Sequence, residues 1–271
     1  MTMERRTALG LLSAALATAA TTAGAKVVGK PTPILVIAAT ARTAPEILQQ
    51  GLAQGREVTA LARHPDGIEI RDPKLKIVQG DVYDLASLAA AMTGAETVIS
   101  LIGPKVQLDK EMGYVDIYSV GIATVIAAMK LKGNRRLIAV SSGGTEQIPA
   151  EKPTDGNPID EWCWRERNLY GDMQRMEKII AVSGLEYVVL RPRGFMKGPK
   201  LDNLKLAVHQ HATDFDQYRD RTLRTPGENS QLSYADFATL VLSLVEGDRY
   251  LGTSVGVYTD HDGLFPSRTA S

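Results

Sequence analysis

The sequence has a single cysteine and no excess of charge of either sign. Cys163 has no partner, so an intrachain disulfide cannot form. The 31 acidic residues balance 31 basic ones, which argues against a dedicated nucleic-acid-binding protein. His209 and His211 have no third ligand at a characteristic spacing, so no metal site is expected. At 271 residues, the chain is long enough for one large α/β domain.

Hydrophobic runs long enough to span a bilayer are also missing. The apolar stretch 7–25 is too short to span a membrane, follows Arg5-Arg6, and ends in Ala23-Gly24-Ala25. This pattern predicts a twin-arginine signal peptide over residues 1–25, which leaves 26–271 as a single domain. We therefore expect a periplasmic or secreted protein without a stable membrane anchor after cleavage. An amphipathic N-terminal helix or an uncleaved anchor is the alternative.

The stretch 33–63 has the pattern of a βαβ unit. The short branched run Ile34 to Ile37 predicts a strand buried on both faces. A turn of small residues follows, and Pro45 suits the first turn of a helix because that position needs no N–H. A second strand is expected from Val58 to Leu61. Such a unit presents a helix N-terminus to the pyrophosphate of a dinucleotide.

Glycine is absent from the turn of this unit. Ala38, Ala41 and Ala44 stand at the G-x-x-G-x-x-G positions of dinucleotide-binding turns. A methyl group costs about 1 kcal/mol or more where the backbone needs a positive φ, and it hinders close approach of phosphates. A βαβ unit that binds no nucleotide is therefore the alternative.

Strand and helix patterns alternate through the rest of the chain, which predicts a Rossmann-like, doubly wound parallel α/β sheet with a small C-terminal substrate-side region. A loop is expected from Thr145 to Asn168 and a helix from Tyr170 to Val182. Ser233 and Asp236 can cap a later helix. Further strands are predicted at 75–78, 97–102, 136–142, 186–192 and 254–258.

Seven segments in family order resemble the atypical short-chain dehydrogenases/reductases of the NAD(P)-binding, NmrA-like kind, and most closely the flavin reductase/biliverdin-IXβ reductase group. These segments are ILVIAATARTAPEIL, VTALAR, IVQGDVYD, VISLIGP, RLIAVSSGG, DMQRMEKIIAVSGLEYVVLRP and LSYADFATLVLSLVE. The resemblance implies an NADPH-preferring Rossmann domain, with NAD possible, and a substrate cleft over the nicotinamide.

The resemblance also implies a set of cofactor contacts. Arg63 would meet the adenosine 2′-phosphate, and this fits because arginine forms bidentate contacts with phosphate. A solvated strand end is the alternative for that residue. The remaining cofactor positions are Ala38, Thr40, Ala41, Arg42 and Thr43 at the phosphates, Asp81 and Val82 at the adenine, Leu101, Ile102 and Gly103 at the ribose and nicotinamide, and Ser142 at the reactive end.

A lysine is missing from the usual catalytic pair. Tyr170 invites a Tyr-x-x-x-Lys reading, in which lysine lowers the phenol pKa, but residue 174 is Gln. Tyr170 is therefore a candidate catalytic residue or a packing residue at a helix start. In the resembled group the cofactor supplies hydride directly to a flat substrate. Ser141 is the first candidate for a hydrogen-bond donor on the substrate side.

Three further residues are candidates for substrate contact. Lys105 follows the fourth strand and could bind an anionic substrate or be a loop cation. Trp162 and Trp164 could stack on an aromatic ligand or cover the core as a lid. Together the patterns predict an exported NAD(P)H-dependent oxidoreductase that reduces a small planar quinone-, flavin- or carbonyl-like substrate. A non-redox binding protein, or a cofactor-free isomerase or lyase, is the alternative.

Overall fold

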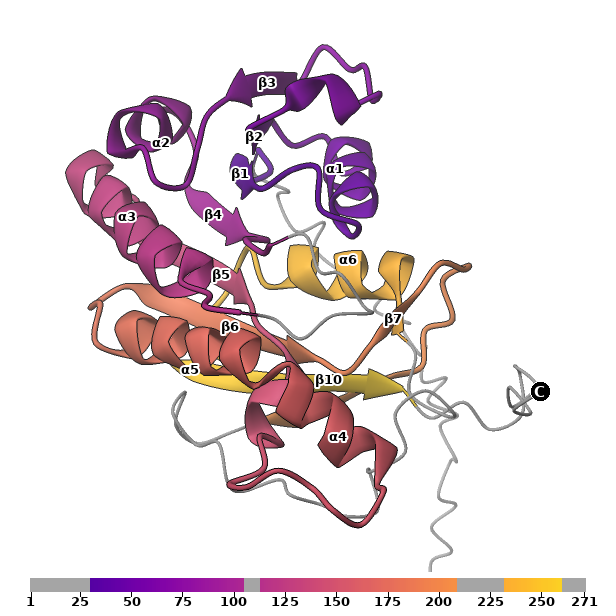
Figure 1. Ribbon diagram of the computed structural model, residues 1–271. Coiled ribbons are helices and arrows are strands. Elements are labelled where there is room, and N and C mark those ends of the chain that lie inside the picture. Colours follow the sequence, from indigo (N-terminus) through magenta and orange to yellow (C-terminus); the bar gives the residue numbers. More distant parts are fainter. Residues whose placement is uncertain (1–29, 105–112, 209–231, 260–271) are drawn as a thin grey trace, which may run out of the picture.

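The computed structural model describes residues 30–104, 113–208 and 232–259. Within them, eight strands form one sheet in the order β3-β2-β1-β4-β5-β6-β10-β8 (Figure 1). Seven of the strands run parallel, and β8 is antiparallel to β10. The strands are β1 Ile34–Ile37, β2 Val58–Ala62, β3 Leu75–Gln79, β4 Thr97–Ser100, β5 Arg136–Val140, β6 Glu186–Pro192, β8 Leu204–Val208 and β10 Thr253–Thr259.

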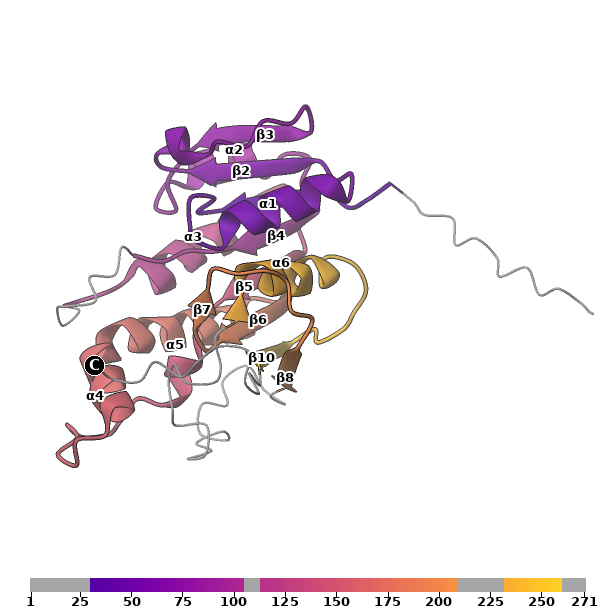
Figure 2. The same cartoon turned by 90° about the vertical axis from the view of Figure 1, so that its right-hand side faces the viewer.

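Helices cover both faces of the sheet (Figures 1 and 2). One face packs against α1 (Ala44–Ala53) and α6 (Tyr234–Ser243). The other packs against α2 (Leu85–Ala91), α3 (Ile117–Lys132) and α5 (Arg167–Ala181). This arrangement confirms the predicted doubly wound α/β fold.

Strand β1 shows why the sheet needs two helical layers. All four of its residues are buried. Ile34 and Val36 belong to the core under α1 and α6, whereas Leu35 and Ile37 belong to the core under α2, α3 and α5. A strand that alternates between two apolar layers must be apolar throughout, as the sequence indicated.

The predicted cap of α6 is confirmed. The Ser233 hydroxyl oxygen accepts a hydrogen bond from the Asp236 backbone N–H at 3.0 Å, and the same hydroxyl donates to the Asp236 carboxylate at 2.6 Å. The Asp236 carboxylate also accepts the backbone N–H groups of Leu201 and Asp202. The cap therefore fixes the segment after β6 as well as the helix.

The expected loop from Thr145 to Asn168 is wrong in part. It contains the end of a 3₁₀ turn, η2 (Gly143–Glu146), and a helix, α4 (Pro158–Arg165). Pro158 opens this helix at a position where its missing N–H costs nothing, so it starts a helix where a loop was expected. Helix α5 likewise begins at Arg167, three residues before the predicted start.

Short elements near the C-terminus were not expected from the sequence. Strand β8 lies in a stretch for which no strand was predicted, and its Leu204 and Leu206 alternate with the exposed Lys205. A second, two-stranded parallel ladder joins β7 (Phe195–Met196) to β9 (Leu232–Ser233). These elements border the carboxyl end of β6.

A buried network of charged side chains joins β6, α5 and η2. The Arg191 side chain is fully buried, and its guanidinium lies 2.6 Å from the Glu177 carboxylate and 3.0 Å from that of Glu146. Arg193 lies 2.8 Å from the other Glu146 oxygen. Burial raises the pKa of Glu177, and the Arg191 charge opposes that rise. Because each carboxylate faces a guanidinium, removing one partner leaves an uncompensated charge in the core.

We predict that Glu177→Ala lowers the free energy of unfolding by about 3–5 kcal/mol, since Arg191 loses its nearest carboxylate inside the core. Urea denaturation followed by circular dichroism measures this. Lys30→Ala is the control, because the Lys30–Glu57 pair is exposed and its loss leaves the denaturation midpoint nearly unchanged. A Glu177→Ala loss below about 1 kcal/mol contradicts the structural role of the network.

Candidate active site at the carboxyl edge of the sheet

Five loops meet at one edge of the sheet because the strands that precede them are parallel. Strand β1 pairs with β2 on one side and β4 on the other, so the chain changes direction across the sheet at β1. Ligands of doubly wound folds bind at such a switch point. The predicted cofactor positions follow β1 to β5, at 38–43, 63, 81–82, 101–103 and 142.

Only one alanine of the turn after β1 has a glycine-like backbone. Ala38 has φ of 58°, whereas Ala41 and Ala44 have negative φ. Backbone hydrogen bonds from Ala41 to Ala38 (2.8 Å) and from Ala44 to Ala41 (2.9 Å) close the turn and lead into α1. The expected strain from three methyl groups is therefore confined to Ala38.

The same turn and the end of β2 expose cationic side chains. Thr40 and Arg42 are exposed, and Thr43 is the N-cap residue of α1 without a side-chain capping bond. Arg63 is exposed directly after β2. Among the described residues, neither the Arg42 nor the Arg63 guanidinium makes a hydrogen bond or an ion pair. Both are free to bind an anion at this edge.

Three of the positions predicted at the adenine and nicotinamide lie in the core beneath this edge of the sheet. Val82, Leu101 and Ile102 are buried core residues. The Asp81 carboxylate accepts the Tyr83 backbone N–H at 3.1 Å and so shapes the turn after β3. Gly103 is exposed, and a Cβ placed there would lie 3.0 Å from the Tyr118 hydroxyl, so a larger residue would crowd that phenol.

The two serines after β5 have different surroundings. The Ser141 hydroxyl is buried and donates to the Glu177 carboxylate, so it is part of the charged network. The Ser142 hydroxyl oxygen accepts the Gly144 backbone N–H at 3.1 Å, and the residue is half-buried. The geometry thus favours Ser142 over Ser141 as the serine near the reaction; the substrate role of Ser141 stays a prediction.

Tyr170 lies at the first turn of α5 against η2. Its hydroxyl oxygen accepts a hydrogen bond from the Trp162 indole N–H at 3.0 Å. The ring packs so closely on Gly144 that a Cβ there would lie 2.3 Å from the ring carbon Cζ. Burial raises the pKa of Tyr170 to about 12, while the hydrogen bonds from Trp162 and Ser142 act to lower it. The phenol is therefore protonated at neutral pH.

The other predicted substrate residues are only partly placed. Trp162 and Trp164 lie half-buried on α4, with the Arg165 and Arg167 guanidinium carbons 4.3 Å and 4.5 Å from their respective ring centroids. Lys105 lies outside the described residues. In the ranges that the structure describes, no cluster of three potential metal ligands occurs, and no helix has the length and apolarity needed to cross a membrane.

Glu166, which the sequence did not single out, is buried at the junction of α4 and α5. Its side chain is 1% exposed, and among the described residues neither carboxylate oxygen has a hydrogen-bond partner. Burial raises its pKa, opposed by Arg165 at 3.5 Å. A glutamate in a segment of alternating charged and aromatic residues gives no sequence signal of burial.

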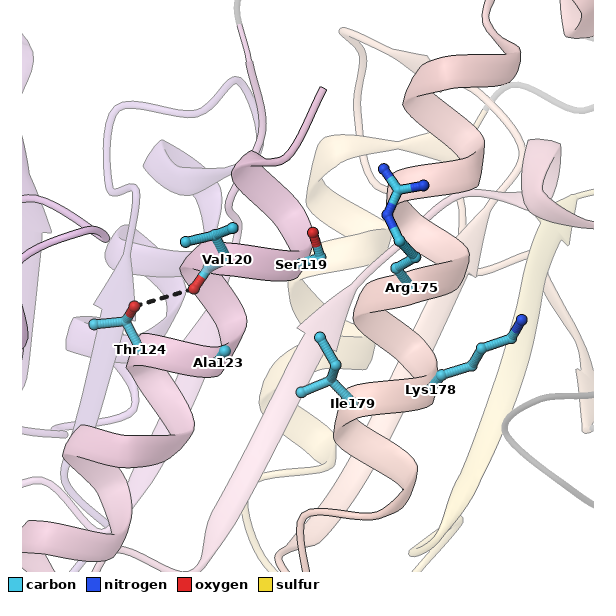
Figure 3. Close-up of a pocket in the computed structure, with 7 residues that line it drawn as sticks. All are labelled: Ser119, Val120, Ala123, Thr124, Arg175, Lys178 and Ile179. Carbon is cyan, nitrogen blue, oxygen red and sulfur yellow. Dashed lines mark hydrogen bonds between the residues drawn. The ribbon is translucent and has the colours of Figure 1, made fainter. Parts of the chain in front are cut away.

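An open groove of about 590 Å³ lies elsewhere, between α3 and α5 (Figure 3). Ser119, Val120, Ala123 and Thr124 line it from α3, and Arg175, Lys178 and Ile179 line it from α5. None of the predicted site residues contributes to it. The groove lies on a helical face, whereas the candidate site lies at the strand ends.

A family model described as NAD(P)H-binding matches residues 38–245, which begin at the turn after β1 and end just beyond α6. The chain belongs to this NAD(P)H-binding family. Its Rossmann-like fold and its likeness to atypical short-chain dehydrogenases/reductases are thereby confirmed.

Relatives of this family member include cinnamoyl-CoA reductase 1 of Oryza sativa subsp. japonica, 29% identical over 57% of this chain and 50% of that protein. The chain spans about half the length of the curated relatives it matches.

Solved structures share the fold. A Rossmann-fold NAD(P)-binding family protein from Shigella flexneri is 24% identical, with a TM-score of 0.60, over 86% of this chain and 98% of that chain. A short-chain dehydrogenase/reductase from Veillonella parvula in complex with NADP is 16% identical, with a TM-score of 0.61, over 88% of this chain and 99% of that chain.

The backbone of the alanine turn leads to a paired prediction. Ala38→Gly should raise the free energy of unfolding by about 1 kcal/mol, because it relieves a methyl group at positive φ. Ala44→Gly should lower it by about 1 kcal/mol, because that residue has negative φ at the start of α1. Thermal and urea denaturation measure both. Equal effects of the two variants would contradict the assignment of strain to Ala38 alone.

Proposed function

We propose that this protein is an exported NAD(P)H-dependent reductase that transfers hydride to a small planar substrate with a carbonyl-like oxygen, such as a quinone, an aldehyde or a ketone. The observation that carries the proposal is the Tyr170 phenol. It is protonated, its oxygen accepts the Trp162 indole N–H, and its ring lies in the first turn of α5 against Gly144, which follows β5.

The edge suits a dinucleotide. Thr40 and Arg42 would hold the pyrophosphate over the N-terminus of α1, where the helix dipole also favours negative charge. Arg63 would bind a 2′-phosphate, which favours NADP over NAD. The turn leaves one methyl group at a positive φ, and two guanidinium groups without partners among the described residues face solvent near it.

The proposed reaction needs a hydride from the cofactor and a proton from the protein. A nicotinamide held at this edge would supply the hydride for the new C–H bond at the substrate carbonyl carbon. Tyr170 gives its phenolic proton to the carbonyl oxygen, which becomes a hydroxyl, and the phenolate is reprotonated from solvent. Trp162 donates to the phenol oxygen while it carries negative charge. A phenol that is protonated at neutral pH suits this reductive direction.

A carbonyl-like substrate makes better use of this site than a flavin does. A positioned acid accelerates a step in which an oxygen gains charge. Half-buried Trp162 and Trp164 on the neighbouring helix could contact a flat ligand. The name of the rice relative, a reductase of a CoA thioester, agrees with a carbonyl-type substrate.

A second candidate function is a non-redox protein of the same fold. It is favoured by Ala38, whose methyl group stands where the turn needs a left-handed backbone, and by the absence of a lysine at position 174. Such a protein would bind neither NADPH nor NADH at millimolar concentration.

Export rests on Arg5-Arg6 and the apolar stretch that follows. The twin-arginine route carries folded proteins, so a cofactor could travel with the chain. Replacing Arg5 and Arg6 by lysine should retain the protein in the cytoplasm, as measured by immunoblotting of cell fractions. Equal amounts of the original and altered chains in the periplasm would rule out this route.

Cofactor preference gives the direct test of the redox proposal. Arg63→Ala should weaken NADPH binding about tenfold and leave NADH binding nearly unchanged, because it removes a charge-assisted contact with the 2′-phosphate. Arg42→Ala should weaken both. Isothermal titration calorimetry measures the affinities, and NADPH oxidation with menadione or cinnamaldehyde measures turnover.

The matched control is Arg135→Ala, an exposed arginine next to the amino end of β5 and therefore at the opposite edge. It should change neither affinity. If wild-type protein shows no NADPH binding and no turnover with either probe, the redox proposal fails and the non-redox alternative stands.

A further inference from the structure

The Trp162–Tyr170 hydrogen bond joins two helices across the α4–α5 junction. The indole nitrogen lies 3.0 Å from the phenol oxygen. An indole N–H can donate but cannot accept, so in this pair the phenol oxygen is the acceptor. The phenol therefore does not donate its proton to Trp162.

Gln174 occupies the position at which a lysine would support Tyr170, and its side chain binds elsewhere. Gln174 stands four residues after Tyr170 on α5, and residues with this spacing are neighbours on a helix. Its side-chain amide donates to the Thr145 backbone carbonyl at 2.8 Å. Gln174 thus fixes η2 and does not bind the phenol in this structure.

We propose that Trp162 is the positioning residue for Tyr170, and that its neutral indole N–H replaces the lysine that this chain lacks. This inference rests on the proposed function, because it assigns Trp162 a role in proton donation by Tyr170. Trp162 acts through the phenol, so it needs no contact with the substrate.

The hydrogen bonds around the phenol determine which proton is left to donate. The Ser142 hydroxyl oxygen accepts the Gly144 N–H, and Ser142 acts with Trp162 to lower the phenol pKa. The phenol oxygen accepts from Trp162, so its own O–H proton is left to donate, and under the proposed function the acceptor is the substrate oxygen. Trp162 in turn is held by the Arg165 guanidinium stacked 4.3 Å from the ring centroid.

A neutral donor has a different consequence from a cation. A lysine would stabilise the phenolate by charge and allow Tyr170 to act as a base, whereas an indole N–H stabilises it less. Cys163 on α4, Glu166 at the α4–α5 junction and Tyr118 on α3 add no positive charge. Two cations lie around the same junction, and each has another partner: Arg165 stacks on Trp162 and faces Glu166, and Arg193 pairs with Glu146. The site is therefore arranged for reduction and against alcohol oxidation at neutral pH.

The hydrogen bond can be tested without substrate or cofactor. A fluorinated tyrosine, which is more acidic than tyrosine, is placed at position 170 of the full chain, and its ionisation is followed by fluorine NMR. The protein has two tryptophans, so two indole N–H signals are followed in the same titration. The Trp162 signal should move at the pKa of the fluorotyrosine, while the Trp164 signal should not. A Trp162 signal that ignores this ionisation overturns the proposal even if no Trp162 variant folds.

Variants measure how much the Trp162 hydrogen bond lowers the pKa of the phenol. Trp162→Phe should raise the fluorotyrosine pKa by about 1, as expected for the loss of one hydrogen bond. Adding Gln174→Lys to that variant should lower the pKa again, because a cation then stands one helical turn from the phenol. Trp164→Phe is the matched control and should leave the pKa unchanged. Equal pKa values in the Trp162→Phe protein and the unsubstituted protein overturn the proposal.

Turnover separates this inference from the proposed function. In NADPH-dependent reduction of cinnamaldehyde, Trp162→Phe should lower kcat about tenfold with little change in the KM for NADPH. Gln174→Lys should restore part of the loss. Normal kcat in the Trp162→Phe variant overturns the inference while the reductase assignment stands. An inactive wild-type protein that fails to bind NADPH defeats the proposed function, whatever the NMR titration shows.

Discussion

Parallel pairing of β1 with β2 and with β4 is the constraint on which the site depends. In this register Ile37 lies opposite Leu61 and Ser100, so the chain leaves all three strands at nearly the same level. The alanine turn, Arg63 and the segment after β4 therefore share one edge. That pairing is held by apolar residues on both faces of β1, and without either helical layer the strand would expose half of its side chains.

Two opposing contributions to the binding free energy decide whether a dinucleotide can occupy this edge. The methyl group of Ala38 at positive φ costs about 1 kcal/mol. Charge-assisted hydrogen bonds to phosphate contribute roughly 1.5–3 kcal/mol each, and Arg42 and Arg63 are both available for them. The two arginines therefore contribute more to binding than the methyl group costs.

Near Tyr170, the Arg191 network holds β6, α5 and η2 together and thereby fixes Gly144, on which the Tyr170 ring packs.

Much of the fold follows from the sequence because strand and helix patterns are local. The apolar run Ile34–Ile37 and the Ser233 cap each depend on a few neighbouring residues. The site is less predictable. Glutamate and arginine usually stay exposed, and Glu177 and Arg191 are buried because they pair with each other across 14 residues and with Ser141 and Glu146. The choice between Ser141 and Ser142 depends on which way each hydroxyl turns at a strand end, and the Trp162–Tyr170 contact crosses a break between helices.

The proposed function requires that one left-handed alanine leave room for a pyrophosphate beside the N-terminus of α1. A crystal structure of the chain grown with NADP⁺ tests it most directly. We expect density for the pyrophosphate against residues 38–44, the 2′-phosphate at Arg63, and the nicotinamide within reach of the Tyr170 hydroxyl. A well-ordered turn with the Ala38 methyl group in the space of the phosphates, and no bound nucleotide at saturating concentration, would contradict it.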